Sequence, residues 1–420
     1  MAVGNYSSTL CAELNRLANA GVYPARSAFL DEQGAANKWA GTTGKSLVAA
    51  LNIKNGVTNP SLFKNLGAVC NALASTTGKS PLAALTSISG DTPSYLALGA
   101  SISPFIWAAS FSKSSGISSL FANPASLPAQ QVYPVEFNSD ASRLAYGDNS
   151  PGTSVTNYAF SSSGFGSKSA AATVNTGERT TSFMVFDSTM NNAKTLSLWG
   201  MDNNVVAVIP FTASGFATGL RYQAPNAATT YSIAMNASDS ALFSCGSSDF
   251  GARAWSNSTY GGTTFTAPAG IGGAAAFFGI RVNPAENVVA VASQNLKNIY
   301  AYAWSNSTGW GTKYTDTVSN SASLGRGVLF SPDSSYLWSF TDAGTFRFPF
   351  SSGSGFGTRT SGGFTSGVSY ARFNAAGDTV AATGYSRGFE LYPWDGTTLG
   401  TMYTKPTFAT TGHQKLAFHG

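Results

Sequence analysis

The chain has 420 residues, of which 43% are hydrophobic, 13% aromatic and 10% charged. So few charges with so many aromatics exclude an intrinsically disordered chain, and the length allows a large core plus a smaller domain. The formal charge of +5 is uneven, since residues 1–90 carry seven Lys and Arg against three Asp and Glu, whereas residues 91–420 carry 17 against 16. The basic residues of 1–90 do not cluster into a phosphate-binding stripe, so we expect no nucleic-acid partner.

The cysteines and the apolar runs bear on the compartment in which the chain is made. Cys11, Cys70 and Cys245 are scattered and odd in number, so they indicate neither a disulfide framework nor a Cys-based metal or redox motif. No apolar run reaches about 18 residues, and no basic-then-apolar signal opens the chain, so we expect no membrane insertion. We therefore expect a soluble chain that is made in a reducing cytoplasm.

Residues 1–90 are expected to form a small, mainly α domain. In residues 1–36, Leu10, Leu14 and Leu17 recur on one helical face behind a serine that can cap the helix. This spacing predicts one helix near the start of the chain, before a different pattern begins.

A repeat occupies residues 37–54 and recurs, less well preserved, in residues 71–88. Each copy contains Thr-Thr-Gly-Lys-Ser before an apolar stretch, which predicts a turn and a short helix capped by Ser46 or Ser80. Thr-Gly-Lys-Ser is also the end of a phosphate-binding loop, but the first copy has Trp39 where such a loop needs its first glycine. We expect no nucleotide and no other cofactor.

The first copy reads Asn-Lys-Trp-Ala-Gly-Thr-Thr-Gly-Lys-Ser-Leu-Val-Ala-Ala-Leu-Asn-Ile-Lys over residues 37–54. This pattern resembles short repeats in the structural proteins of tailed bacteriophages, especially tail and fibre-like proteins. The resemblance implies a virion component whose residues 1–90 contact other virion proteins. The candidate anchoring residues are Lys38, Trp39, Lys45, Lys54 and Lys79.

From residue 91 onward a different repeat is present. Two apolar or aromatic residues two positions apart precede a small-residue turn, which ends in Gly and another apolar residue. The apolar residue after the turn recurs every 43 to 51 residues, as Ile117, Phe165, Phe216, Tyr260, Trp310, Phe356 and Leu399. Strand, glycine turn and strand at this period are typical of the blades of a β-propeller, which stack to bury their apolar faces.

Each predicted blade also contains an earlier hairpin between two apolar strands. The first strands are expected to end at Phe137, Met235, Val282, Phe330 and Phe373. Aspartates recur in the turns that follow, where we expect them to stabilise the backbone, namely Asp140, Asp239, Asp333 and Asp378. One blade is expected to be irregular, with a longer loop through Asn191 and Asn192 after Asp187. The hairpins resemble those of tryptophan–aspartate and lactonase-like propellers.

The two ends of the propeller segment complete each other. Residues 94–122 contain a predicted second strand, third strand and glycine turn, but no first strand, whereas residues 414–420 form a lone first strand. Together they make one blade and leave no open sheet edge. We therefore predict a mainly β fold, a seven-bladed β-propeller over residues 91–420 closed by the C-terminal strand and preceded by the small, mainly α domain of residues 1–90.

The sequence offers little for catalysis or metal binding. The two histidines, His413 and His419, both lie on the predicted closing strand, and neither has an acidic or Cys partner at ligand spacing. A Ser-His-Asp triad or a metal-dependent lactonase centre would need more histidines or inward carboxylates than the chain has. We expect no metal site and no enzyme.

Aromatic residues at one repeated position are interpreted as blade-packing residues, namely Phe160, Phe211, Trp255, Trp304, Phe350 and Trp394. Aromatics outside the repeat are candidates for stacking on carbohydrate, namely Tyr146, Trp199, Tyr222, Trp338 and Tyr385. The most irregular loops are rich in amides that suit hydroxyl-rich sugars, and they contain the candidate host-contact residues Asn191, Asn192, Asn203, Asn204, Lys297 and Asn298. The open alternative is that asparagine simply tolerates tight turns.

The leading hypothesis is a bacteriophage virion protein, assembled into particles in the host cytoplasm. Residues 1–90 would anchor a propeller that is tail-associated and contacts a host-surface receptor or glycan, in several copies on a symmetric site. A capsid-decorating protein or head fibre is the second hypothesis, and a lactonase-like or glycan-active enzyme is the third. The location of the chain in the particle distinguishes the first two, whereas the few histidines and carboxylates disfavour the third.

Overall fold

The structure is a computed structural model of residues 1–420. It describes four helical alanines before residue 94, namely Ala36, Ala40, Ala49 and Ala50, and residues 94–419 with gaps. The gaps are 113–115, 149–154, 171, 173–184, 202–203, 226–228, 258–261, 267, 269–275, 294–298, 315–323, 365–366, 385–386 and 405–412. The chain divides into two units, Met1–Thr92 and Pro93–Gly420. Apart from these four alanines, residues 1–93 lie outside the described residues, so the helix of residues 1–36 and both repeats stay predictions.

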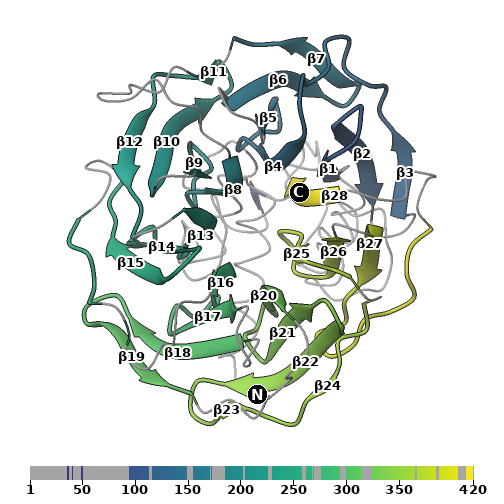
Figure 1. The fold of residues 1–420 in the computed structure, drawn as a ribbon. Coiled ribbons are helices and arrows are strands. Elements are labelled where there is room, and N and C mark those ends of the chain that lie inside the picture. The colour runs from purple at the N-terminus through teal and green to yellow at the C-terminus, as the bar shows by residue number, and fades with distance from the viewer. Residues whose placement is uncertain are drawn as a thin grey trace. The chain divides into compact units, whose positions relative to one another are not determined.

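The second unit is a seven-bladed β-propeller, in which seven antiparallel sheets surround a central axis (Figure 1). Each blade has one strand nearest the axis, and these innermost strands are β28 His413–His419, β4 Val132–Phe137, β8 Val185–Met190, β13 Thr230–Met235, β16 Phe277–Val282, β20 Gly325–Phe330 and β25 Tyr370–Phe373. In this order they are the innermost strands of blades 1 to 7. Innermost strands of neighbouring blades contact one another around the whole ring.

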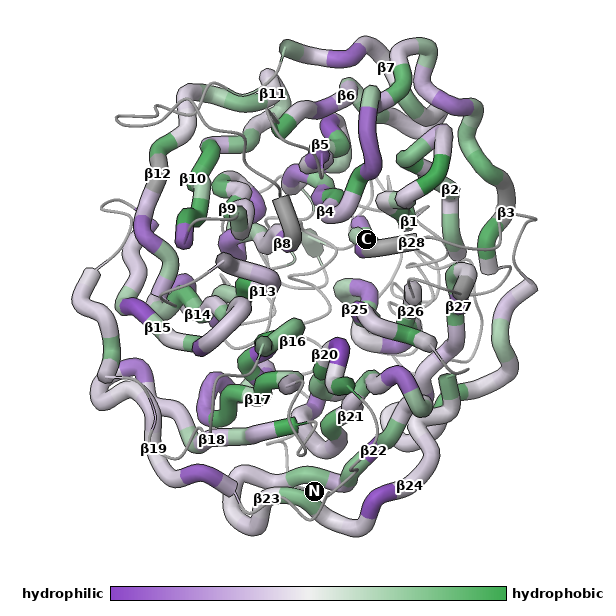
Figure 2. Tube along the Cα trace, in the orientation of Figure 1, coloured by the Kyte–Doolittle hydropathy of each residue, from purple (hydrophilic) through white to green (hydrophobic). Residues whose placement is uncertain are grey.

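Each blade continues outward through a second and a third strand. The second strands are β1 Ser94–Ala100, β5 Arg143–Asp148, β9 Leu196–Met201, β14 Ala241–Gly246, β17 Val288–Ser293, β21 Tyr336–Thr341 and β26 Thr379–Gly384. The third strands are β2 Ile106–Ser112, β6 Val155–Ser161, β10 Val205–Thr212, β15 Phe250–Ala254, β18 Ile299–Ser305, β22 Gly344–Ser351 and β27 Arg387–Pro393. Figure 2 shows hydrophobic residues along β10 and β17, because both faces of these strands pack against neighbouring blades.

The outermost strands are short. They are β3 Gly116–Leu120, β7 Gly164–Lys168, β11 Gly215–Phe216, β12 Leu220–Gln223, β19 Gly309–Lys313, β23 Gly355–Phe356 and β24 Thr360–Ser361. Among the described residues, blades 4 and 7 have an isolated β-bridge in place of an outermost strand. These bridges join Arg253 to Thr264 and Trp394 to Leu399. No helix among the described residues is both long enough and apolar enough to cross a membrane.

The predicted sequence pattern of strand, glycine turn and strand forms the hairpin between the third strand and the outermost strand of a blade. Phe160 pairs with Phe165 across this hairpin, and Trp304 pairs with Trp310 in the same way. The turn ends at a glycine with positive φ, for example 80° at Gly309, which other residues rarely adopt. The sequence repeat is therefore a repeat of this hairpin, as predicted.

The hairpin between first and second strands is built on a buried polar residue. The side-chain oxygen of Asn283 accepts hydrogen bonds from the backbone N–H groups of Asn287 (3.0 Å) and Val288 (2.9 Å). Equivalent bonds reach Asn138, Asn191, Asn236, Ser331 and Asn374. The predicted ends of the first strands at Phe137, Met235, Val282, Phe330 and Phe373 are confirmed.

The expectation of an irregular blade with a longer loop after Asp187 is wrong. Strand β8 continues past Asp187 to Met190, and β9 begins at Leu196. Asn191 accepts hydrogen bonds from the N–H groups of Thr195 and Leu196, each 2.8 Å long. This hairpin is the same as in the other blades, because Met190 and Asn191 take the places of a Phe-Asn pair.

The predicted closure of the ring is confirmed. Strand β28 pairs with β1 in antiparallel register, with Phe418 opposite Leu96 and Leu416 opposite Leu98. These four side chains are buried in one cluster with residues of blade 7. The C-terminal strand thus supplies the innermost strand of blade 1 and joins the two ends of the propeller.

Candidate functional site

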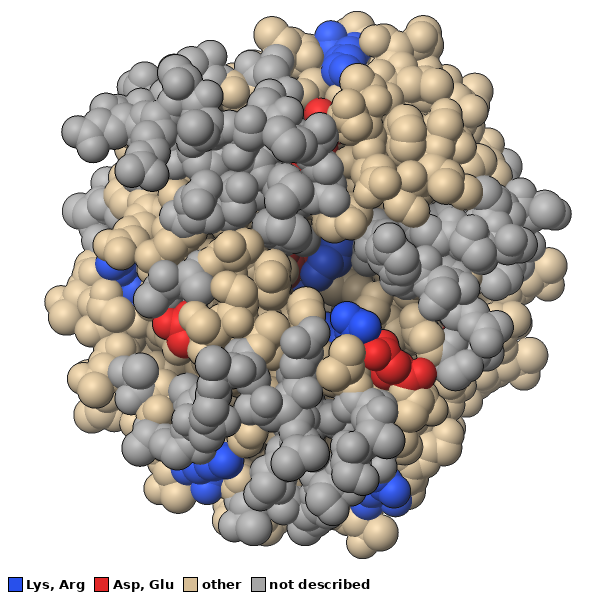
Figure 3. Space-filling model, viewed as in Figure 1, with Lys and Arg blue, Asp and Glu red and all other residues tan. Residues whose placement is uncertain are grey.

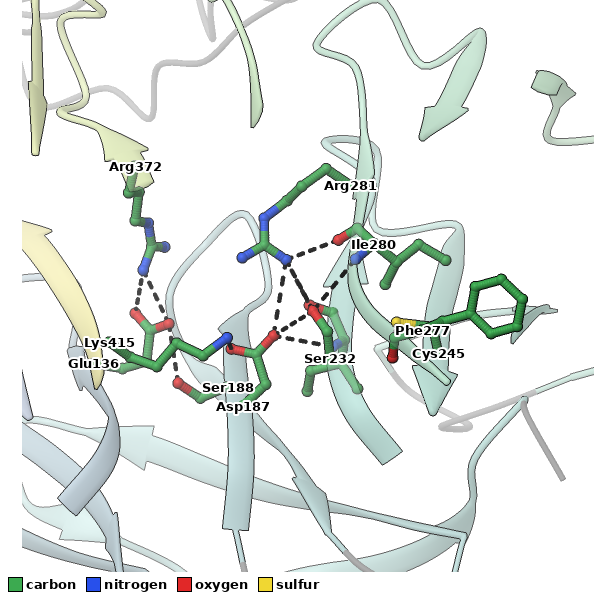
Figure 4. Close-up of polar contacts among 11 residues, drawn as sticks. Glu136, Asp187, Ser188, Ser232, Cys245, Phe277, Ile280, Arg281, Arg372 and Lys415 are labelled. Carbon is green, nitrogen blue, oxygen red and sulfur yellow. Dashed lines mark hydrogen bonds and ion pairs between the residues drawn. The ribbon is translucent and has the colours of Figure 1, made fainter. Parts of the chain in front are cut away.

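Charged and polar side chains from several innermost strands meet at the axis (Figure 4). Glu136, Arg281 and Arg372 each stand one residue before the last residue of their strands, and Asp187 stands three before. Because side chains alternate along a strand, these positions lie on the same side. With Lys415 of β28, they form a group that we call the axial cluster.

Glu136 and Arg372 form the first ion pair of the axial cluster. The Nη1 atom of Arg372 lies 3.0 Å from each carboxylate oxygen of Glu136, and the Ser188 hydroxyl donates to the same carboxylate at 3.3 Å. Burial raises the pKa of Glu136, although Arg372 opposes this effect. Burial alone would lower the pKa of Arg372, but the Glu136 carboxylate outweighs it and keeps the guanidinium charged.

Asp187 is the second buried carboxylate, with a side chain that is 1% exposed. It accepts hydrogen bonds from the Ser232 hydroxyl (2.6 Å) and the Ile233 N–H (3.2 Å). Nζ of Lys415 lies 3.3 Å from one carboxylate oxygen and Nη1 of Arg281 lies 3.8 Å from the other. Burial would raise the pKa of Asp187, but these cations and hydrogen bonds outweigh it and hold the pKa below its usual range.

The ion pairs of the axial cluster join blades that are not neighbours. Glu136 belongs to blade 2 and Arg372 to blade 7, so their pair passes blade 1. The pair of Asp187 with Lys415 passes blade 2. These ion pairs across the axis therefore stabilise the ring of blades in addition to the packing between adjacent blades.

Tyr370 of β25 lies among the cations of the axial cluster. Nζ of Lys415 stands 4.3 Å from the centre of its ring, and Cζ of Arg281 stands 5.1 Å from it. Such distances are typical of cation–π contacts. Burial raises the pKa of Tyr370, so the phenol stays neutral beside these groups.

Figure 3 shows basic and acidic side chains together in the hollow at the middle of the face that it presents. Within the described residues, no group of three or more His, Cys, Asp or Glu side chains is arranged to hold a metal. Cys245 is a buried thiol beside the Phe277 carbonyl, and burial raises its pKa, which disfavours the nucleophilic thiolate. Nε2 of His419 lies 3.1 Å from the Ser139 carbonyl, and burial lowers its pKa.

The candidate host-contact residues lie at opposite ends of blade 3 where they are described. Asn191 is a buried residue of the first hairpin, so its amide stabilises a turn. Asn192 is exposed, and its backbone N–H donates to Asp239 of blade 4 at 2.8 Å. Asn204 has a φ of 62° between β9 and β10, which fits the turn alternative. Asn203, Lys297 and Asn298 lie outside the described residues.

The candidate anchoring residues all lie outside the described residues, namely Lys38, Trp39, Lys45, Lys54 and Lys79. Among the candidates for carbohydrate stacking, Tyr146, Trp199 and Trp338 are fully buried on second strands, so this interpretation is wrong for them. Tyr222 is half-buried, and Tyr385 is not among the described residues.

The structural interpretation is confirmed for the repeated aromatics, and among the turn aspartates for Asp140 and Asp333. The blade-packing aromatics are all buried, namely Phe160, Phe211, Trp255, Trp304, Phe350 and Trp394. Asp140 accepts a hydrogen bond from the N–H of Ser142, and Asp333 does the same for Ser335. Asp239 differs, because it accepts from Asn192 of the neighbouring blade and so joins two hairpins.

The sequence interpretation missed the axial cluster. A usable signal exists in part, because Glu136, Arg281 and Arg372 each directly precede the apolar residue that ends a first strand. A charged residue beside a hairpin in an otherwise buried strand needs a partner. The partners themselves are far away in the sequence.

The comparisons with known proteins show the fold alone. The propeller is similar to a protein from Lactobacillus plantarum, with 12% identity, a TM-score of 0.60, and coverage of 78% of this chain and 100% of the other. It is also similar to a periplasmic gluconolactonase of Pseudomonas aeruginosa, with 13% identity, a TM-score of 0.57, and coverage of 78% and 99%. No protein-family model matches the sequence, and no curated protein matches it either.

Proposed function

We propose that the chain is a bacteriophage virion structural protein whose propeller is carried on the tail and contacts the host surface. The repeats of residues 37–54 and 71–88 support the assignment to a virion, through their resemblance to phage tail and fibre-like proteins. Residues 1–90 would bind other virion proteins, with Lys38, Trp39 and Lys54 among the contacts. Several copies would occupy a symmetric site on the particle.

The observation that supports a binding module most is the pairing of the axial carboxylates. Glu136 is engaged by Arg372, and Asp187 is engaged by Lys415 and Arg281. Carboxylates held in this way brace a scaffold, whereas a general acid or base must be able to exchange its proton with a substrate. A braced ring that presents loops is well suited to binding, because loops on a rigid scaffold can be varied without loss of the fold.

Two alternatives remain open to experiment. A capsid-decorating protein or head fibre would use the same propeller at another place on the particle. A lactone hydrolase is favoured by the likeness in fold to solved structures that include a gluconolactonase. Hydrolysis of gluconolactone by the purified full chain, above the rate in buffer and sensitive to Glu136→Gln, would support the hydrolase and contradict the proposal.

The virion assignment is tested with particles that are produced with a tagged form of the full chain. Cryo-electron microscopy with a gold-labelled antibody to the tag is expected to place several symmetric copies on the tail. Label on the head would support the decoration alternative, and particles without label would overturn the virion assignment. The variant Trp39→Ala with Lys54→Ala is expected to reduce incorporation, whereas Asn192→Ala on the propeller is expected to leave it unchanged.

A further inference from the structure

A β-bulge interrupts several innermost strands at one repeated position. The register passes from Thr230 directly to Ser232 in β13, so that Tyr231 is the extra residue. The same interruption makes Phe186, Phe278 and Arg326 the extra residues of β8, β16 and β20. A bulge turns a side chain away from its regular direction, and bulges are frequent beside binding sites.

The bulged residues of blades 4, 5 and 6 form a continuous stack, which we call the collar. The rings of Tyr231 and Phe278 are stacked, with centres 5.2 Å apart and planes at 10°. Cζ of Arg326 stands 5.3 Å from the centre of the Phe278 ring. Arg326 is fixed by two hydrogen bonds to Asp342, of 2.7 and 3.0 Å. All three collar side chains are partly exposed.

The collar lies close to the axial cluster. Phe278 and Arg281 are three residues apart on β16, which corresponds to about 10 Å along a strand. Tyr231 directly precedes Ser232, whose hydroxyl lies 3.3 Å from Nη1 of Arg281. Because the Arg281 guanidinium lies against Ser232, beside Tyr231, one acidic sugar can touch the collar and this guanidinium together.

The axial cluster contains more cations than anions. Arg281, Arg372 and Lys415 stand against only Glu136 and Asp187. Each arginine uses Nη1 for its ion pair, and within the described part of the chain Nε and Nη2 of Arg281 and Arg372 form no hydrogen bond. Both side chains are partly exposed, at 21% and 32%. Two guanidinium groups with spare donors favour a carboxylate ligand, since guanidinium and carboxylate groups pair in a bidentate manner.

We propose that the collar and the axial cluster together bind a carboxylate-bearing sugar of a host-surface polysaccharide. The apolar C–H face of the sugar packs against Tyr231 and Phe278, and its carboxylate accepts hydrogen bonds from Arg281 and Arg372. The spare positive charge of the axial cluster is then balanced by the ligand. This inference rests on the proposed contact with the host surface and names the chemistry of that contact.

The test compares two small probes that differ only in charge, methyl glucuronide and methyl glucoside. Binding to the full-length chain is measured by titration calorimetry and by saturation-transfer NMR. We expect the glucuronide to bind at least tenfold more tightly than the glucoside, and affinity for it to fall as salt is added. Equal binding of the two sugars, or binding of neither, would overturn the proposal and leave the collar as a packing feature.

Two variants locate the site, and one matched control accompanies them. Arg281→Gln is expected to weaken glucuronide binding at least tenfold, and Phe278→Ala is expected to weaken both sugars. Arg359→Gln is the control, because Arg359 also stands over an aromatic ring, 4.7 Å from the centre of Phe346, but on an outer strand connection. If Arg281→Gln does not fold, Phe278→Ala still tests whether the sugar binds at the collar. This variant is expected to fold, because the partly exposed ring of Phe278 takes no part in the ion pairs.

The outcome separates this inference from the proposed function. If the chain blocks adsorption of particles to the host but binds no glucuronide, host contact stands and the acidic-sugar site is wrong. If the chain binds glucuronide through Arg281 but does not affect adsorption, the site stands and the host-contact function is wrong. Unchanged glucuronide binding in both variants would place the sugar elsewhere and contradict the inference.

Discussion

Lys415 of β28 lies 3.3 Å from Asp187 of β8, and the two residues belong to blades 1 and 3 of the ring. The last strand of the chain is thus fixed twice, by backbone hydrogen bonds to β1 and by an ion pair across the axis. Closure of the propeller and formation of the axial cluster are therefore coupled events. This coupling leads to predictions for stability that do not depend on the function.

Deletion of residues 413–420 is expected to destabilise the propeller strongly. It removes the buried side chains of Leu416 and Phe418, each of which contributes roughly 1.5–3 kcal/mol, and it exposes the edge of β1. We expect a lower midpoint of urea unfolding and a tendency to aggregate. Urea unfolding followed by tryptophan fluorescence measures this, and an unchanged midpoint would contradict closure by β28.

The variant Lys415→Met is expected to lower the free energy of unfolding by about 3–5 kcal/mol, because it leaves Asp187 buried with a weaker partner. The control is Lys313→Met, since Lys313 also stands 4.3 Å from the centre of an aromatic ring, that of Tyr300. No ion pair of Lys313 is present among the described residues. A similar loss in both variants would show that the cation–π contact, and not the ion pair, is responsible.

Stability should also depend on pH through Asp187. Burial opposes its ionisation, but Lys415 and Arg281 outweigh this and hold its pKa below the ordinary value of 3.8. A carboxyl group with a lower pKa in the folded state stabilises the fold above its unfolded pKa, and this contribution is lost as the pH falls through the folded pKa. Unfolding free energies at pH 6 and pH 3 should therefore differ more in the wild type than in Asp187→Asn.

This comparison isolates Asp187 from the other axial carboxylate. Burial raises the pKa of Glu136, so its contribution to stability changes with pH in the opposite direction. Glu136 is present in both proteins, and Asp187 is the weakest of the influences on its pKa, so the difference between the proteins removes most of its contribution. An equal change with pH in both proteins would show that Asp187 is not stabilised by its partners.

The stability of the hairpin between first and second strands is expected to depend on its buried asparagine. Asn283→Ala removes the acceptor for the N–H groups of Asn287 and Val288 and is expected to cost about 1–3 kcal/mol of stability. Asn283→Asp keeps an acceptor oxygen at this place and should cost clearly less. Thermal unfolding of the two variants measures the difference, and equal losses would mean that the accepted hydrogen bonds do not hold the turn.

The parts of the fold that repeat could be predicted from the sequence. The aromatic hairpins, such as Phe160 with Phe165, depend on local spacing that recurs in most blades. Ring closure was also predictable, because the missing first strand of residues 94–122 and the lone strand at the end are complementary. These features rest on periodicity, which a single sequence displays directly.

The bulges and the axial cluster could not be predicted in the same way. Tyr231, Phe278 and Arg326 share a position four residues before the end of their strands but differ in chemistry, so no residue type marks the bulge. The partners Asp187 and Lys415 meet only after the ring has closed. Local propensity carries no information on such pairs, because they depend on the whole topology.

The burial of Tyr146, Trp199 and Trp338 has a similar origin. Each stands close to a turn in the sequence, which suggested exposure, yet each lies on a second strand between two neighbouring blades. Position within the blade, and not distance from a turn, decides whether an aromatic side chain of a propeller can reach a ligand.

Adsorption of particles to host cells is the most direct test of contact between the propeller and the host. Host cells are first incubated with increasing amounts of the purified full-length chain, and particles are then added and the unadsorbed fraction is counted. We expect this fraction to rise with the concentration of the folded chain, and we expect heat-unfolded chain to have no effect. Adsorption that stays unchanged at saturating amounts of folded chain would contradict contact between the propeller and the host.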